Sequence, residues 1–179
     1  MATLPRLTLV LGGARSGKSA LAERLAEATE APRLYVATAE ALDAEMRARI
    51  DAHRGRRMPG WQTVECPLSL QSALADAPAK AIVLVDCATL WLSNHLLAGH
   101  DLQAESMGLL SALRDCPAKV IVVSNEVGMS IVPENRLARQ FSDAQGRLNQ
   151  LLATQAQLVI VVWAGLPLVL KGFAPEAML

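Results

Sequence analysis

The stretch that decides the fold is LTLVLGGARSGKS, which runs from Leu7 to Ser19. Its apolar first half predicts a buried strand, its second half has the spacing Gly-x-x-x-x-Gly-Lys-Ser, and a helix is predicted from Ala20 to Glu30. Glycines let backbone N–H groups turn toward phosphate oxygens, Lys18 reaches the outer phosphates, and the Ser19 hydroxyl is placed to ligate Mg²⁺. An incidental glycine-rich turn is the alternative, but the strand before and the helix after are typical of a nucleotide-binding loop.

Composition bounds the size and class of the protein. The chain has 179 residues, 52% of them apolar, which is enough for one well-buried core, so we expect a single catalytic domain over residues 1–179. Lysine and arginine together number 17, as do aspartate and glutamate. This balance gives no positive field that would favour nucleic acid as a partner.

Cysteine usage and hydropathy indicate the compartment. Cys66, Cys87 and Cys116 are widely spaced, odd in number and form no Cys-x-x-Cys pair, which predicts reduced thiols and argues against structural zinc. No signal peptide is recognisable, and no apolar run approaches the ~18 residues of a membrane span. We therefore expect a cytoplasmic protein without a membrane span.

Short apolar runs alternate with helical segments along the chain. Their nearly continuous apolar character is typical of parallel strands covered on both faces, which predicts an α/β fold with a mainly parallel sheet flanked by helices. Ligands of such sheets gather at the carboxyl ends of the strands. The predicted strands are Leu7–Leu11, Leu34–Ala37, Ile82–Val85, Val120–Val123 and Leu158–Trp163, with a shorter one near Gln62–Glu65.

A charged amphipathic helix is predicted from Leu42 to His53, and His53 continues its apolar stripe. The basic segment Arg54-Gly55-Arg56-Arg57 follows immediately, a setting that attracts phosphates and would hold an imidazole nitrogen beside a nucleotide α-phosphorus. From these residues alone, a partly buried structural histidine is the favoured interpretation. His95 and His100 have no motif around them and are interpreted as surface or helix-packing residues.

Asp86 ends the predicted strand Ile82–Val85, where P-loop proteins hold the carboxylate that positions Mg²⁺ beside the loop serine. Ser19 and Asp86 are therefore the predicted metal ligands. The alternative is that Asp86 caps the helix that starts near Thr89, and the two roles are compatible.

A polar loop from Ser124 to Asn135 follows the next strand and is expected to face the substrate. It lacks the Asn-Lys-x-Asp motif of a regulatory GTPase. Pro133 suits the first turn of a long helix predicted to run toward Ala156. On that helix Arg136, Arg139 and Arg147 are either solvated or able to reach a phosphate at a neighbouring subunit.

Several blocks of the sequence resemble, in the same order, one enzyme family. The chain is similar to the bifunctional adenosylcobinamide kinase/adenosylcobinamide-phosphate guanylyltransferases over most of its length. The blocks that carry the resemblance are Gly12–Ser19, Tyr35-Val-Ala-Thr38, Glu45-Met-x-x-Arg49-Ile50-x-x-His53-Arg54, Asp86-Cys87-x-Thr89-Leu90-Trp91-x-x-Asn94 and Asn125-Glu126-Val-Gly-x-x-Ile-Val-Pro133-Glu-Asn-Arg136.

The resemblance implies a RecA-like P-loop fold, a homotrimer and two reactions of cobalamin (vitamin B12) assembly. Adenosylcobinamide is phosphorylated by ATP or GTP, and GMP is then transferred from GTP to adenosylcobinamide phosphate through a guanylyl group on His53, with Lys18 also catalytic and Mg²⁺ bound. Position 52, where some relatives carry a second histidine, is alanine here. The implied nucleotide-binding residues are Gly12, Gly13, Ala14, Arg15, Ser16, Gly17, Lys18, Ser19, Ala37, Thr38, Ala39, Arg54, Gly55, Arg56, Arg57, Glu65 and Asp86.

Two other functions are alternatives to this one. In a monofunctional small-molecule kinase, Lys18, Ser19 and Asp86 would do all the chemistry and His53 would be structural. A nucleotide-gated regulatory module would bind GTP without turnover. Trp61, Trp91 and Trp163 could line a corrinoid groove, although tryptophans more often belong to the core.

Overall fold

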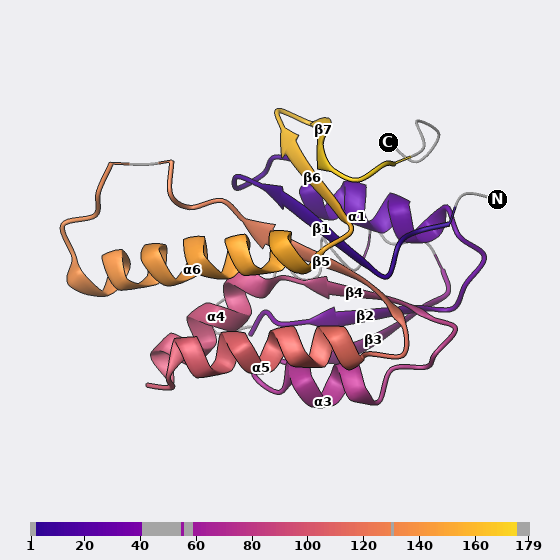
Figure 1. Ribbon diagram of the computed structural model, residues 1–179, viewed down its shortest axis with the longest axis horizontal. Coiled ribbons are helices and arrows are strands. Elements are labelled where there is room, and N and C mark those ends of the chain that lie inside the picture. Colours follow the sequence, from indigo (N-terminus) through magenta and orange to yellow (C-terminus); the bar gives the residue numbers. More distant parts are fainter. Residues whose placement is uncertain (1–2, 41–54, 56–58, 130, 175–179) are drawn as a thin grey trace.

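The computed structural model describes residues 3–40, 55, 59–129 and 131–174. Its centre is a seven-stranded sheet with the order β3-β2-β4-β5-β1-β6-β7 (Figure 1). Every neighbouring pair is parallel except β6 and β7, which confirms the predicted mainly parallel sheet. The strands are β1 (Leu7–Gly12), β2 (Arg33–Ala37), β3 (Trp61–Glu65), β4 (Ile82–Asp86), β5 (Lys119–Asn125), β6 (Leu158–Trp163) and β7 (Leu166–Lys171).

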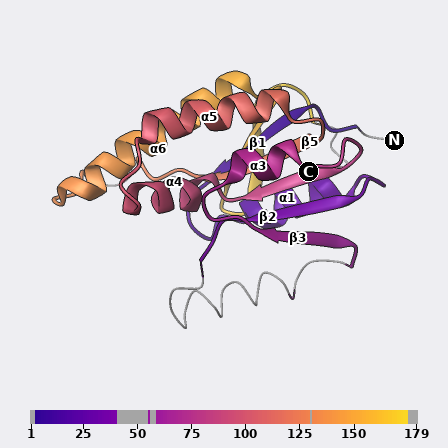
Figure 2. The same ribbon diagram turned by 90° about the horizontal axis from the view of Figure 1, so that it is seen from below.

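Helices cover both faces of this sheet, as expected for an α/β fold. The described helices are α1 (Lys18–Glu27), α3 (Leu70–Ala75), α4 (Ala88–Leu97), α5 (Leu102–Asp115) and α6 (Arg136–Gln155). Helices α3 to α6 gather on one side, and α1 packs on the other, as the two views together show (Figures 1 and 2). None of the described helices has the length and apolar character needed to cross a membrane. The helix predicted from Leu42 to His53 lies outside the described residues.

The central strands β1, β4, β5 and β6 are apolar along most of their length because successive side chains enter different layers of the core. In β4, Val83 and Val85 pack with the helices of one face, whereas Ile82 and Leu84 pack with α1. All four side chains are buried. This two-sided burial explains why the central strands have nearly continuous apolar sequences, whereas the edge strands β3 and β7 are largely exposed.

The long helix α6 begins later than the sequence suggested. Its N-cap is Asn135, whose side chain accepts a hydrogen bond from the backbone N–H of Leu137 at 2.7 Å. Pro133 therefore lies before the helix, and its predicted place in the first turn is wrong. An asparagine side chain can bond the free N–H groups of a helix start, and this local interaction sets the boundary.

Strand register brings the predicted binding residues to one edge of the sheet. Gly12 at the end of β1 pairs with Asn125 at the end of β5, and Ala37 at the end of β2 lies between Glu65 and Asp86. Because these strands are parallel, all five residues lie at their carboxyl ends. The fold thus positions the site where open α/β sheets bind ligands.

Candidate active site

The loop between β1 and α1 has the geometry of a phosphate-binding loop. Gly17, the N-cap of α1, has a φ of 98°, a left-handed conformation that favours glycine. A Cβ atom on Gly12 would stand 2.7 Å from the carbonyl oxygen of Val162 in β6. The backbone N–H of Gly165 donates to the Ser16 carbonyl at 3.0 Å and so ties the loop to the β6–β7 hairpin. The two glycines are therefore required by the backbone path.

Lys18, the first residue of α1, is largely buried within this loop. Its Nζ donates a hydrogen bond to the Gly13 carbonyl at 3.1 Å. Burial lowers the pKa of the Lys18 ammonium group, and Cys87 and Asp86 oppose this with a smaller effect. Burial also raises the pKa of the Cys87 thiol to about 12, so this thiol is neutral at neutral pH. Asp86 is thus the anionic neighbour that favours a charged Lys18.

Asp86 accepts hydrogen bonds on both carboxylate oxygens. The Ser19 hydroxyl donates to Oδ1 at 3.4 Å, and the Tyr35 hydroxyl donates to Oδ2 at 2.8 Å. The cap of α4 is Cys87, whose sulfur accepts from the Leu90 backbone N–H at 3.5 Å. The alternative role of Asp86 as the helix cap is therefore wrong. Hydroxyl and carboxylate oxygens side by side at a helix start are a donor set that fits Mg²⁺.

Thr38 fastens the turn after β2 to the end of β4. Its side chain donates to the Cys87 carbonyl and accepts from the Cys87 N–H, both at 2.8 Å. Its carbonyl accepts from Asn94 Nδ2 at 2.9 Å. The hydroxyl of Thr38 is therefore engaged with the protein, and Glu65, exposed at the end of β3, lies next to this turn.

A buried polar network supports the end of β5, and sequence reasoning missed most of it. Ser124 Oγ donates to Asn149 Oδ1 at 2.7 Å and accepts from Gln145 Nε2 at 2.9 Å. Asn149 also donates to the Asn125 carbonyl at 3.0 Å, and the Asn125 N–H donates to Thr89 Oγ1 at 2.7 Å. Two amide side chains on the apolar stripe of α6 were the signal that could have found it.

Two buried oxygen atoms near the phosphate loop have no hydrogen-bond partner within the described part of the chain. They are Ser16 Oγ, in the loop, and Asn125 Oδ1, beside Gly12 in the sheet. Buried polar atoms are ordinarily paired, so both are candidates to contact a ligand. This agrees with the expectation that the loop starting at Ser124 faces the substrate.

Most of the segment around the predicted nucleophile is outside the part of the chain that the structure describes. His53, Arg54, Arg56 and Arg57 lie outside the described residues, and Gly55 is described and exposed. The structure therefore assembles the phosphate loop, the turn after β2, Glu65 and Asp86 at one edge of the sheet.

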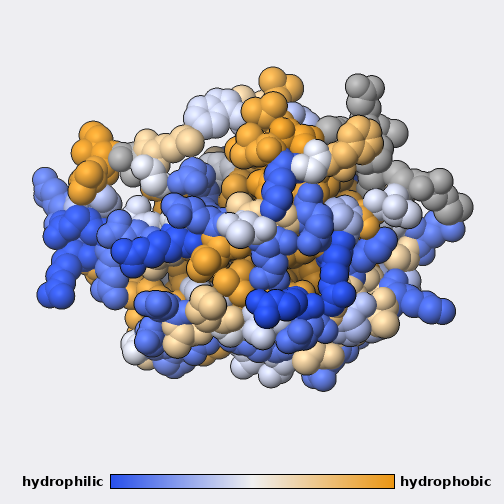
Figure 3. All heavy atoms as spheres, viewed as in Figure 1, coloured by the Kyte–Doolittle hydropathy of each residue, from blue (hydrophilic) through white to orange (hydrophobic). Residues whose placement is uncertain are grey.

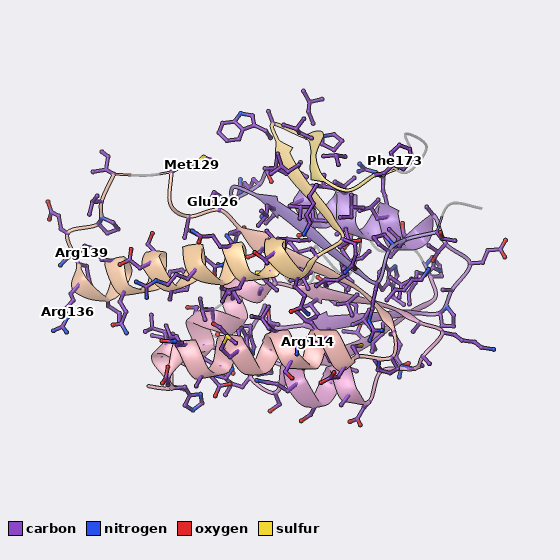
Figure 4. All side chains as sticks on the ribbon, in the orientation of Figure 1. Arg114, Glu126, Met129, Arg136, Arg139 and Phe173 are labelled. Atoms are coloured by element: carbon purple, nitrogen blue, oxygen red, sulfur yellow. The ribbon has the colours of Figure 1, made fainter. Side chains whose placement is uncertain are left out.

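The loop after β5 and the start of α6 project away from the sheet. Arg139 donates to the Pro133 carbonyl at 2.8 Å, and also to the Glu134 carbonyl, and so holds the loop against the helix. Figure 4 shows Arg136 and Arg139 at the end of α6 that is far from the sheet, and Met129 on the loop nearer to Glu126. A groove of about 610 Å³ lies between loop and helix, and Arg139 and Arg147 line it.

A phosphate loop between β1 and α1, with a carboxylate at the end of β4 beside the loop serine, defines a P-loop NTPase. Residues 8–170 match the family model described as cobinamide kinase / cobinamide phosphate guanyltransferase. The chain therefore belongs to this family, which makes it a transferase.

Relatives named bifunctional adenosylcobalamin biosynthesis proteins align with 92% of this chain. CobP of Pseudomonas aeruginosa is 47% identical over 167 residues, which cover 96% of that protein. CobU of Escherichia coli K12 is 43% identical over 181 residues, which cover 99% of that protein.

One solved structure agrees with the fold at low sequence identity. The structure described as a structural study of Project ID PH0250 from Pyrococcus horikoshii OT3 has a TM-score of 0.51 and 13% identity, and the alignment covers 96% of this chain and 88% of that one. The RadB recombinase has a TM-score of 0.43 at 19% identity, with 87% and 73% covered. The first of these likenesses concerns the fold alone.

Proposed function

We propose that the protein phosphorylates adenosylcobinamide with ATP or GTP and then transfers GMP from GTP to the new phosphate, which gives adenosylcobinamide-GDP. The observation that carries this proposal is the match of residues 8–170 to the family, together with a phosphate loop whose Ser19 contacts Asp86. A plain kinase shares the loop but not the family match. Both steps act on phosphates, which suits one site with a phosphate-binding loop.

For the kinase step, the proposed roles follow from the chain's own groups. Backbone N–H groups of the loop and the Lys18 ammonium group would hold the phosphates and offset the charge that develops on the transferred phosphoryl group. Ser19 and Asp86 would hold Mg²⁺. When bound, Mg²⁺ would supply positive charge that offsets the negative charge of the triphosphate. The Tyr35 hydroxyl would orient Asp86 through its 2.8 Å hydrogen bond.

For the guanylyl step, His53 is the proposed nucleophile. A neutral imidazole nitrogen attacks the α-phosphorus of GTP, a P–N bond forms, the bond to the bridging oxygen breaks, and pyrophosphate leaves. A phosphate oxygen of adenosylcobinamide phosphate then displaces the imidazole. Arg54, Arg56 and Arg57 would offset the charge on the departing pyrophosphate. The first step requires a lone pair, so it weakens as His53 becomes protonated.

The remaining nucleotide contacts are proposed for the carboxyl ends of β2 and β3. Ala37, Thr38 and Ala39 lie at the end of β2 and in the turn after it, which Thr38 fastens to Cys87 after β4, and Glu65 pairs with Ala37. Because the Thr38 hydroxyl is bonded to Cys87, contacts from this turn would come from its backbone and from Ala39. Ser16 Oγ and Asn125 Oδ1 add two polar atoms suited to a ligand.

We further propose a homotrimer. Apolar side chains are exposed at two separate places, on the β6–β7 hairpin and on the loop before α6. Figure 3 shows a cluster of hydrophobic residues over the hairpin. Two different surfaces suit head-to-tail contacts, which close into a ring. The exposed residues are Trp163, Leu166, Leu168, Leu170 and Phe173 around the hairpin, and Met129, Ile131 and Val132 on the loop.

The test is turnover with adenosylcobinamide, Mg²⁺ and either ATP or GTP, followed by mass analysis of the corrinoid. We expect the phosphate with ATP alone and the GDP derivative once GTP is present. His53→Ala should stop at the phosphate, and Lys18→Ala should lower phosphorylation by a factor of about 100 or more. Phosphate without any GDP derivative would favour the monofunctional kinase. Light scattering in the same buffer should give the mass of three chains.

A further inference from the structure

His95, His100 and Glu105 meet at the corner between α4 and α5, away from the phosphate loop. Their nearest ligand atoms lie within 4.8 Å of one another. His95 is seven residues beyond Ala88 at the start of α4, which places it about 10 Å along the helix from Ala88, the residue that follows Asp86 and Cys87. We propose that this corner is a binding site for one divalent transition-metal ion of the zinc type. The cysteine spacing argued against structural zinc, and this site uses no cysteine.

The end of α4 holds the two imidazoles together. Gly99 has a φ of 75° and donates to the Leu96 carbonyl at 3.1 Å, while the His100 N–H donates to the His95 carbonyl at 3.0 Å. This is the Schellman pattern, in which the side chains at the positions of His95 and His100 come into contact. An apolar pair commonly fills these positions. Here the two Nδ1 atoms are 2.9 Å apart.

The protein sets the proton on His95 so that its Nδ1 can bind a metal. Nε2 of His95 lies 3.2 Å from the Leu68 carbonyl oxygen, which can only accept, so Nε2 carries a proton. In the neutral ring, Nδ1 then has a free lone pair. A metal-binding histidine is ordinarily oriented by such a bond from its other nitrogen. The ring is 3% exposed and packs edge-on against Trp91, with centroids 4.6 Å apart.

Glu105 completes the donor set from the first turn of α5. Its Oε2 is 3.7 Å from His95 Nδ1 and accepts from Gln71 Nε2 at 3.2 Å. Two donors bound to one zinc-type ion at about 2.0–2.1 Å lie at most about 4.2 Å apart, and the distances from His95 Nδ1 to both partners satisfy this limit. The third distance joins His100 and Glu105. His100 is exposed and Glu105 is partly exposed, so small side-chain rotations can bring their ligand atoms within the same limit.

Imidazole and carboxylate ligands together suit zinc and its transition-metal neighbours better than Mg²⁺ or Ca²⁺.

Without an ion, one proton lies between the two Nδ1 atoms. The ion replaces this proton, and His100 then carries its proton on Nε2, toward solvent. The neighbouring residue Asn94 donates to the Thr38 and Pro67 carbonyls, so an ion at this corner would stiffen the support of the turn after β2.

The test uses the full chain without a histidine tag, treated with a chelator and then titrated with Co²⁺ and with Zn²⁺ against a chromophoric indicator. We expect one ion per chain, a visible d–d absorption spectrum with Co²⁺, and a melting temperature that rises with zinc concentration. His100→Ala should weaken binding by more than about 100-fold, beyond the effect of a typical outer-shell change. Because the His100 side chain is exposed, the variant should fold like the native protein, and circular dichroism checks this.

The matched control is His53→Ala, because the chain has 3 histidines and this one lies outside the proposed set. It should bind the ion like the native protein. Glu105→Gln, which can still accept from Gln71, should bind the ion more weakly than native. Equal affinity in native protein and His100→Ala would overturn the proposal. So would the lack of any Co²⁺ spectrum or zinc competition in the native protein, which would leave the two rings joined by a hydrogen bond alone.

Discussion

Replacing Tyr35 with phenylalanine tests whether Asp86 must be held by its hydroxyl partners. The substitution keeps the ring, which contacts Trp61 edge-on with centroids 5.9 Å apart, and removes the 2.8 Å hydrogen bond to Asp86 Oδ2. A hydrogen bond to a charged group contributes about 1.5–3 kcal/mol. Asp86 is partly exposed and can recruit water, so we expect the low end, about 1.5 kcal/mol. For a chain of this size that lowers the melting temperature by about 3–6 °C.

The functional effect should be larger than the loss of stability. An outer-shell partner of a metal ligand typically accounts for a factor of about 10–100 in metal affinity or activity, so the Mg²⁺ concentration for half-maximal kinase turnover should rise by about 10-fold. Trp61→Phe is the matched control, because it removes an aromatic N–H that donates to Glu27 Oε1 at 3.0 Å and leaves Asp86 untouched. A Tyr35→Phe protein with a lowered melting temperature and native Mg²⁺ dependence would refute the proposed role of Asp86.

Three further predictions follow from the phosphate loop and its neighbours. Gly12→Ala should abolish nucleotide binding in equilibrium dialysis, since its Cβ would stand 2.7 Å from the Val162 carbonyl oxygen; native affinity would contradict the loop geometry. Cys87 should resist alkylation at mildly alkaline pH, because burial raises its pKa to about 12, and should react fully after denaturation, as mass spectrometry can check. Burial lowers the pKa of the Lys18 ammonium group, so the affinity for nucleotide phosphates should fall, as the pH rises, at a pH below the ordinary lysine pKa of 10.5. A Lys18→Arg protein should bind phosphates more weakly than the native protein, but its affinity should not show this fall because arginine stays charged.

The central parallel strands were predictable because burial on both faces leaves nearly continuous apolar runs. The edge strand β7 was not, since Pro167 interrupts its pattern and its side chains alternate between half-buried and exposed. The turn that leads into it gave no signal either. Ala164 and Gly165 have φ values of 51° and 83°, a conformation usually marked by Asn-Gly or Asp-Gly.

The site was predictable where chemistry imposes a spacing and not where the fold alone creates a neighbourhood. The phosphate loop and Asp86 were found from the sequence, and the structure joins them through Ser19. The histidine pair at the end of α4 had no motif, because a helix-ending turn brings His95 and His100 together. Hydrogen bonding likewise made Cys87, and not Asp86, the cap of α4.

The measurement that tests the central claim most directly is covalent labelling with Mg²⁺ and GTP labelled at the α-phosphorus, followed by denaturation. The account predicts label on the native chain, none on His53→Ala, and a bond that is labile in acid and stable in alkali, as expected for phosphorus on nitrogen. Native protein that binds GTP but retains no label, or equal label on His53→Ala, would contradict guanylyl transfer through His53.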